Sequence, residues 1–290
     1  MTEDRETKNQ VFQQDAPPQV QPDFPKISKV EAVKAEFGLD IPSERIPLPS
    51  AGLLYPVNHS LHNTGFVEIR PMTTREEDIL TSQALLKKGT VITELIRSCL
   101  VDKTIEPLDL VTGDRNALMI SIRISGYGHE YDAEIQCSEC DAISKHSFDL
   151  TQLGINRLGI SPTSPGVNEF AFTLPKSKFN CTFRFLTGRD EQEIVLTQER
   201  QRKQGMISSN RITAALQHSL VSVNGNTDRS QLSKFITNMP AFDSLALREF
   251  MKKNEPGIDM TQEITCGACG HVEEVSMPIG VNFLWPGSAG

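Results

Sequence analysis

The seven residues EIQCSEC at Glu134–Cys140 return almost unchanged as EITCGAC at Glu263–Cys269. Strand-like runs flank each Cys-x-x-Cys pair, a pattern that is typical of a β-hairpin with its thiols in the turn. Two such turns supply four thiolates, the ligand set that a structural zinc ion prefers in a tetrahedral site. The sequence therefore predicts one zinc-ribbon-like site that two distant segments share. The predicted ligands are Cys137, Cys140, Cys266 and Cys269.

Other interpretations of the four cysteines stay open at this stage. A redox-active Cys-x-x-Cys pair usually opens a helix that follows a strand, whereas strand-like residues follow both pairs here. The four thiols could also lie buried without a metal. His146 and His271 follow the two pairs, but four thiolates leave no vacant position, so both are expected to be surface histidines. Cys99 and Cys181 lie in apolar helix and strand patterns and are expected in the core.

The segments before the two cysteine pairs also resemble each other. At the offset of 129 residues that separates Cys137 from Cys266, identities recur without gaps back to Asp114 and Asp243. An ordered series across helix and strand patterns indicates an internal duplication, and chance similarity of two segments is the alternative. Two units of common origin would bring their like turns face to face. The further identities are Ala117 with Ala246, Leu118 with Leu247, Gly128 with Gly257, Glu134 with Glu263 and Ile135 with Ile264.

These patterns predict an α+β protein made of two helix-rich units, each of which ends in a zinc-knuckle β-hairpin. Unit one is predicted at residues 66–150 and unit two at residues 180–290, which include a C-terminal tail, with a linker at 151–179. Residues 1–27 are rich in Gln, Pro, Asp and Glu and are predicted to form a disordered N-terminal arm. Residues 28–65 are predicted to form a short amphipathic helix followed by an extended, proline-rich segment.

The helices of unit one have clear start and stop signals. Thr74 and Glu77 are predicted to form a capping box, acidic residues fill the first turn, and Gly89 ends the helix. Apolar periodicity predicts two further helices at residues 90–101 and 114–126, although Ile and Ser in the second also suit a strand. In unit two, the stretch TFRFLTGRDEQEIVLTQERQRKQG repeats the order of strand, acidic pair, helix and basic end.

The composition weighs against several classes of function. The chain of 290 residues has 37 acidic and 29 basic residues, a formal charge of −8, so it lacks the basic character of most nucleic-acid-binding proteins. It contains neither an apolar run of the ~18 residues that cross a bilayer nor an apolar signal segment. Without a phosphate-binding loop or a nucleophile with a recognisable histidine partner, a non-enzymatic protein is expected. With six cysteines and no export signal, we expect it in a reducing cytoplasm.

Three stretches, IPLPSAGLLYP, EIRPMTTREEDIL and GDRNALMISIRISGYG, occur in this order ahead of the first cysteine pair. Together with that pair they resemble the baseplate hub family of T-even-type contractile-tailed bacteriophages, over residues 40–285. The resemblance implies a hub subunit or a hub assembly factor, in the host cytoplasm during assembly and in the tail baseplate of the virion. It implies other hub proteins and the tape-measure protein as partners, while the acidic charge and the lack of a long apolar run predict no nucleic acid and no membrane insertion. Unit two retains LTGRDEQEI but not GDRN, so the surface that GDRN forms is expected once per chain.

Two hypotheses from other classes compete with a hub protein: a nucleic-acid-binding zinc-ribbon protein of the transcription type, and a metalloenzyme. Phosphate binding weakens steeply with salt, whereas protein docking need not, so a salt titration separates the first of these from a hub protein. A water molecule coordinated to the metal would indicate an enzyme. The single tryptophan, Trp285, is expected either to cover the core of the protein or to anchor a partner.

Overall fold

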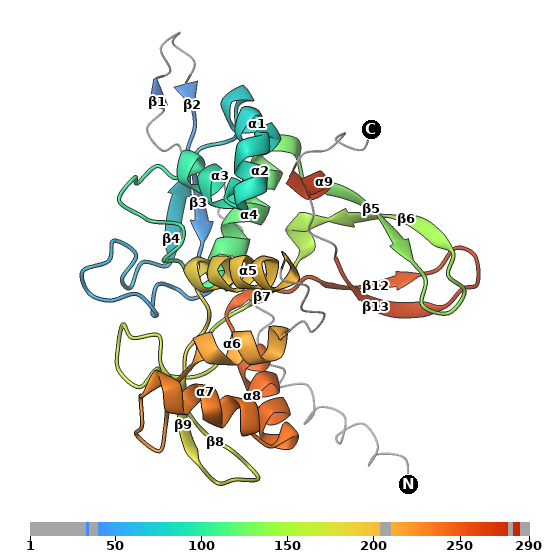
Figure 1. The fold of residues 1–290 in the computed structure, drawn as a ribbon. Coiled ribbons are helices and arrows are strands. Elements are labelled where there is room, and N and C mark those ends of the chain that lie inside the picture. The colour runs from blue at the N-terminus through green and yellow to red at the C-terminus, as the bar shows by residue number, and fades with distance from the viewer. Residues whose placement is uncertain (1–32, 35–39, 204–209, 278–280, 285–290) are drawn as a thin grey trace, which may run out of the picture.

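The computed structural model describes residues 33–34, 40–203, 210–277 and 281–284 (Figure 1). The predicted N-terminal arm at residues 1–27 and Trp285 lie outside the described residues. The helix predicted at the start of residues 28–65 lies largely outside them as well. Its two described residues form strand β1 (Val33–Lys34) and not a helical turn, because they pair with strand β2 (Asp40–Ile41).

The described chain is a mixed α+β protein with several small antiparallel sheets. The elements of its first half are β3 (Glu44–Pro47), β4 (Phe66–Ile69), α1 (Thr74–Thr81), α2 (Gln83–Lys88), α3 (Val91–Cys99) and α4 (Thr112–Tyr127). β3 and β4 form a hairpin, and a bridge between Ile69 and Leu100 brings a third extended segment beside it. α4 packs against β3 and against α3, and α3 also packs against α1.

The second half of the described chain also begins with two paired strands that lead into helices, but it has a further strand, β10, between its helices. Its elements are β8 (Phe170–Thr173), β9 (Asn180–Phe183), α5 (Gly188–Lys203), α6 (Arg211–Ser219), β10 (Leu220–Val223), α7 (Arg229–Asn238) and α8 (Ala241–Asn254). β8, β9 and β10 form a three-stranded sheet with β9 in the centre. β8 lies within residues 151–179, which the sequence predicts as a linker, and β3 lies within residues 28–65, ahead of predicted unit one.

Two β-hairpins carry the cysteine pairs and extend away from the helices (Figure 1). The elements of this region are β5 (Glu130–Gln136), β6 (Ile143–Asp149), the 3₁₀ helix η1 (Leu150–Gln152), β7 (Ile155–Asn156), β11 (Gly257–Ile258), β12 (Thr261–Thr265), β13 (Val272–Ser276) and α9 (Val281–Leu284). β7 pairs with β11, so the chain that leaves the first hairpin contacts the chain that enters the second. Phe283 of α9 packs edge-on against Tyr131 of β5, with ring centroids 5.0 Å apart.

The helices expected in the first half are confirmed, with one difference in continuity. The predicted helices at residues 90–101 and 114–126 correspond to α3 and α4, which settles the second as a helix. Gly89 ends α2 with a left-handed φ of 67°. The helix predicted to run to Gly89 is interrupted at Ser82, which is extended, so the sequence forms the two shorter helices α1 and α2.

The capping box predicted for Thr74 and Glu77 is wrong by one residue. Thr73 is the residue before α1, and both its main-chain N–H and its hydroxyl donate to Glu76, at 2.9 and 2.7 Å. The sequence TTREE contains both Thr-x-x-Glu spacings, so spacing alone does not select between them. Tertiary contacts select the Thr73–Glu76 pair as the capping box, because Glu76 is fully buried beside Arg70 whereas Glu77 is not.

The first turns of α1 and α5 are held by the same hydrogen-bond arrangement. Arg70, at the end of β4, donates through both terminal nitrogens to Glu76, at 3.0 and 2.6 Å. Arg184, at the end of β9, donates in the same way to Asp190, at 2.8 and 2.6 Å. Each acid also accepts from the N–H and the hydroxyl of the threonine that precedes its helix. Such bidentate, charge-assisted pairs are directional, so they fix how each helix leaves its sheet.

A second arrangement recurs at the starts of α4 and α8. Asp114 and Asp243 are the third residues of these helices, and both are fully buried. Asp114 accepts from the N–H of Ser50, at 2.9 Å, and from its hydroxyl. Asp243 accepts from the N–H groups of Lys176 and Ser177, at 2.6 and 3.0 Å. Each acid therefore joins a helix start to the turn that follows the first strand of the same half.

The two halves contact each other closely at the start of α4. Val111 forms a β-bridge with Thr187, just before α5. A Cβ atom on Gly113 would lie 1.6 Å from the carbonyl oxygen of Pro256, so only glycine permits this approach. The buried apolar side chains of both halves form one connected cluster, which fixes the halves as one body from which the hairpins extend.

Candidate metal centre

Both cysteine pairs lie in the turns of their hairpins, and the two turns have the same main-chain hydrogen bonds. The N–H of the first cysteine donates to the carbonyl five residues on, at 2.9 Å for Cys137 and 2.8 Å for Cys266. The carbonyl of the same cysteine accepts from the N–H four residues on, at 3.0 and 2.9 Å. The donors, Asp141 and Gly270, both have left-handed φ values, of 58° and 72°. These equal geometries point all four sulfurs out of the turns toward one another.

The four predicted ligands converge although they come from distant parts of the chain. The Sγ atom of Cys137 lies 3.7 Å from that of Cys269, and the Sγ atom of Cys140 lies 3.7 Å from that of Cys266. All four sulfurs lie within 4.8 Å of one another. A zinc ion with four Zn–S bonds of about 2.3 Å needs tetrahedral S–S separations of about 3.8 Å. The cluster therefore has the dimensions of a four-thiolate site.

The two thiols of the second turn differ, because hydrogen bonding with Cys140 raises the pKa of Cys269 to about 12 whereas the main chain favours a thiolate at Cys266. The N–H groups of Cys269 and Ala268 donate to the sulfur of Cys266, and these hydrogen bonds lower the pKa of Cys266 to about 6. A thiolate, not a thiol, is the form that binds a metal. Beside the sulfurs, Ser138 donates through its N–H and its hydroxyl to Glu273 of the other hairpin, at 3.2 and 2.6 Å. The turns are thus linked by polar contacts as well as by the sulfur cluster.

The remaining cysteines and the neighbouring histidines lie outside this cluster. Cys99 and Cys181 are buried, as predicted, and desolvation raises the pKa of each to about 12, so both are unreactive core thiols. His146 is half-buried, and its Nε2 atom lies 2.8 Å from the hydroxyl oxygen of Ser144. Among the described residues, neither His146 nor His271 belongs to the group of clustered ligands.

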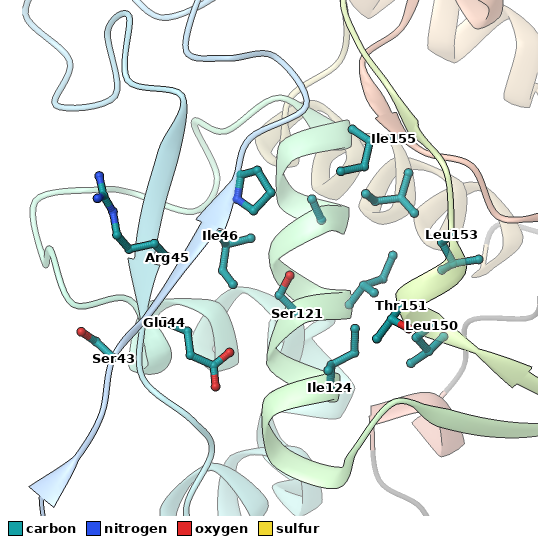
Figure 2. Close-up of a pocket in the computed structure, with 14 residues that line it drawn as sticks. Ser43, Glu44, Arg45, Ile46, Ser121, Ile124, Leu150, Thr151, Leu153 and Ile155 are labelled. Atoms are coloured by element: carbon teal, nitrogen blue, oxygen red, sulfur yellow. The ribbon is translucent and has the colours of Figure 1, made fainter. Parts of the chain in front are cut away.

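Apart from the cysteine cluster, the structure has a groove of about 240 Å³ between β3, α4 and the η1–β7 segment. Ile46, Ile124 and Leu153 line it with apolar side chains, as Figure 2 shows, and Ile258 reaches it from β11. Glu44 points into the groove from β3, and burial raises the pKa of its carboxyl group. The lining holds this single carboxylate and neither cysteine nor histidine, so it lacks a pair of groups for acid–base chemistry. Sequence patterns did not predict the groove, because its walls come from separate segments.

The fold and the cluster together define a mixed α+β protein with a candidate four-thiolate metal centre. Comparison with protein families matches residues 55–285 to the T4 bacteriophage base plate protein family. No curated protein and no solved structure matches the chain. Because the family match covers most of the sequence, the chain belongs to this family of phage baseplate proteins. Within the described residues, every helix is too short or too polar to span a bilayer.

Proposed function

We propose that this chain is a non-enzymatic structural or assembly protein of a phage tail baseplate hub, which acts through protein–protein surfaces on a zinc-cross-linked scaffold. Membership of the family supports a role in the phage baseplate. The hub is supported by the three sequence stretches that resemble hub proteins. The proposed zinc cross-link is supported by one observation: four thiols from two hairpins converge, with two S–S distances of 3.7 Å.

The proposed metal is one structural zinc ion. Its ligands would be Cys137, Cys140, Cys266 and Cys269, whose sulfur spacing suits that ion. A zinc ion with four protein thiolates has no open position for water or substrate, so it would cross-link the hairpins and perform no chemistry. The free energy of metal binding would then contribute to folding, because the ligands meet only in the folded chain.

We infer further that the two halves arose by duplication. The Arg70–Glu76 and Arg184–Asp190 pairs, with their matching threonines, support this inference. The equal turns around the cysteines support it as well. Unit one at residues 66–150 and unit two at residues 180–290, with the linker at 151–179, remain the proposed bounds. β3 and β8 occupy equivalent places just ahead of these bounds.

The proposed partners are other hub proteins and the tape-measure protein, which the chain would meet in the host cytoplasm during tail assembly. A nucleic-acid-binding zinc ribbon would need cations near the metal to contact phosphates. The hairpins and their turns, residues 130–149 and 261–276, instead contain nine acidic residues and one lysine. That charge weighs against the nucleic-acid alternative.

The decisive experiment removes the chain from the phage. In cells infected with a phage that carries a stop codon early in this gene, complete baseplates should be missing from sucrose gradients and hub intermediates should accumulate. A plasmid-borne wild-type chain and the Cys181→Ser variant should restore baseplates, whereas the Cys137→Ser variant should not. Normal baseplates without the chain would refute the proposed function. Mass spectrometry of purified virions would separate a permanent subunit from an assembly factor.

A further inference from the structure

The two hairpins with their turns, residues 130–149 and 261–276, form what we call the hairpin arm, which extends away from the helices (Figure 1). The arm contains nine of the 37 acidic residues of the chain and one of its 29 lysine and arginine residues. Its formal charge is therefore −8, equal to the charge of the whole chain, and all other residues together are neutral. The excess negative charge of the protein is thus confined to one projecting element.

Acidic side chains of the arm lie opposite one another without cations between them. Glu263 pairs across its hairpin with Glu274, and Glu130 pairs with Asp149. All four side chains are exposed, and none forms a salt bridge with a described residue. Like charges directly opposite on one sheet face destabilise the pairing. Asp149 also caps η1 by accepting from Thr151, but Glu263 and Glu274 form no salt bridge with a described residue, which indicates a surface whose counter-charge comes from another molecule.

The outer end of the arm also exposes two aliphatic side chains. Ile143 is 68% exposed and Val272 is 51% exposed. Each is the first strand residue after its cysteine turn, and the two positions are equivalent at the offset of 129 residues. Exposed aliphatic side chains on an otherwise polar projection suit the apolar centre of a protein–protein contact, which a polar rim surrounds. A second, chemically different feature therefore points to a partner at the same place.

We propose that the hairpin arm docks on a lysine- and arginine-rich surface of another baseplate protein, with Ile143 and Val272 as its apolar contacts. This rests on the proposed function, which supplies the class of partner. Complementary charge would steer the encounter and fix the orientation of the arm, while the aliphatic pair would lose its contact with water. Four thiolates around one zinc ion would add two further negative charges at the same end of the arm.

The test measures binding of the purified, zinc-loaded chain to each of the other baseplate proteins of the same phage by biolayer interferometry. The wild-type chain should bind at least one of them, more weakly as salt rises. The double variant Glu263→Lys/Glu274→Lys should bind that protein at least tenfold more weakly. The double variant Glu199→Lys/Glu249→Lys, which changes two exposed acids on α5 and α8 by the same charge, should stay within twofold of wild type.

Zinc content and melting temperature equal to wild type would show that each variant is folded. An Ile143→Ser/Val272→Ser variant should weaken binding without changing its dependence on salt. If the wild-type chain binds a baseplate protein and the arm variants bind equally well, the arm is not the docking surface although the proposed function stands. If the wild-type chain binds none of these proteins, the inference about the arm is overturned, whereas the stop-codon experiment decides the proposed function.

Discussion

Replacing Cys137 or Cys269 with serine should reduce stability by the same amount, although the two residues lie in different halves of the chain. Their sulfurs are 3.7 Å apart in one cluster, so either change leaves three thiolates for one ion. A site with three thiolates and a neutral hydroxyl should hold zinc weakly. The hairpins would then lose their cross-link in both variants.

The size of the loss follows from the loop that the cluster closes. Cys140 and Cys266 are 126 positions apart in the chain. In the chain-entropy model, a cross-link over such a loop restricts the unfolded chain by roughly 5 kcal/mol. For a protein of this size, that free energy corresponds to a fall in melting temperature of roughly 10 to 20 °C.

The assay pairs thermal unfolding, followed by circular dichroism, with zinc analysis by inductively coupled plasma mass spectrometry. The wild-type chain should hold one zinc ion, and a strong chelator should lower its melting temperature to that of the two variants without affecting them further. Cys181→Ser is the matched control, because that core thiol lies outside the cluster and its loss should leave zinc bound. The shared zinc site would be refuted by a wild-type chain that holds no zinc, or by a Cys137→Ser or Cys269→Ser variant with the melting temperature of the wild type.

Three further predictions concern the scaffold. Glu76→Gln and Asp190→Asn should each lower the free energy of unfolding in urea by roughly 3 kcal/mol, because each leaves a partly buried guanidinium without its anion. A loss of stability in only one of these variants would contradict the equivalence of the two ion pairs. Gly113→Ala should destabilise by about 3 kcal/mol or more, whereas Gly267→Ala, which meets no atom within 4 Å, should change stability by less than about 0.5 kcal/mol in the same assay. Burial, and then a neighbouring carboxylate, raise the pKa of Glu255 from 4.5 to about 7, so the folded state binds this proton more tightly than the unfolded state. Stability should therefore fall as the pH rises from 4.5 to 7, by up to about 3 kcal/mol, and melting curves of Glu255→Gln across this range should lack that fall.

Local patterns in the sequence were sufficient to predict the cysteine turns and the helices of the first half. The spacing within each Cys-x-x-Cys pair and the alternation around it predict a hairpin without knowledge of the rest of the fold. The repetition of EIQCSEC as EITCGAC then predicts that the two turns meet, and the sulfurs of Cys137 and Cys269 do lie together. α3 and α4 follow from apolar periodicity, which tertiary contacts reinforce.

Apart from the meeting of the cysteine turns, features that depend on contacts between distant residues were not predicted. Two Thr-x-x-Glu spacings compete at the start of α1, and only Arg70, on the preceding strand, selects Glu76. The carbonyl that approaches Gly113 comes from the other half of the chain, and no local pattern marks such an approach. The apolar groove that Glu44 lines is likewise assembled from separate segments, so its lining residues show no common spacing in the sequence.

The order of the four cysteines along the chain has a consequence for biosynthesis. Cys137 and Cys140 leave the ribosome more than 120 residues before Cys266 and Cys269, so each nascent chain carries half a ligand set while that intervening stretch is made. A polypeptide released early, at a premature stop or by proteolysis, never gains the second pair. Tight retention of zinc would therefore distinguish finished molecules from fragments, and only finished molecules would present a rigid arm to the growing tail.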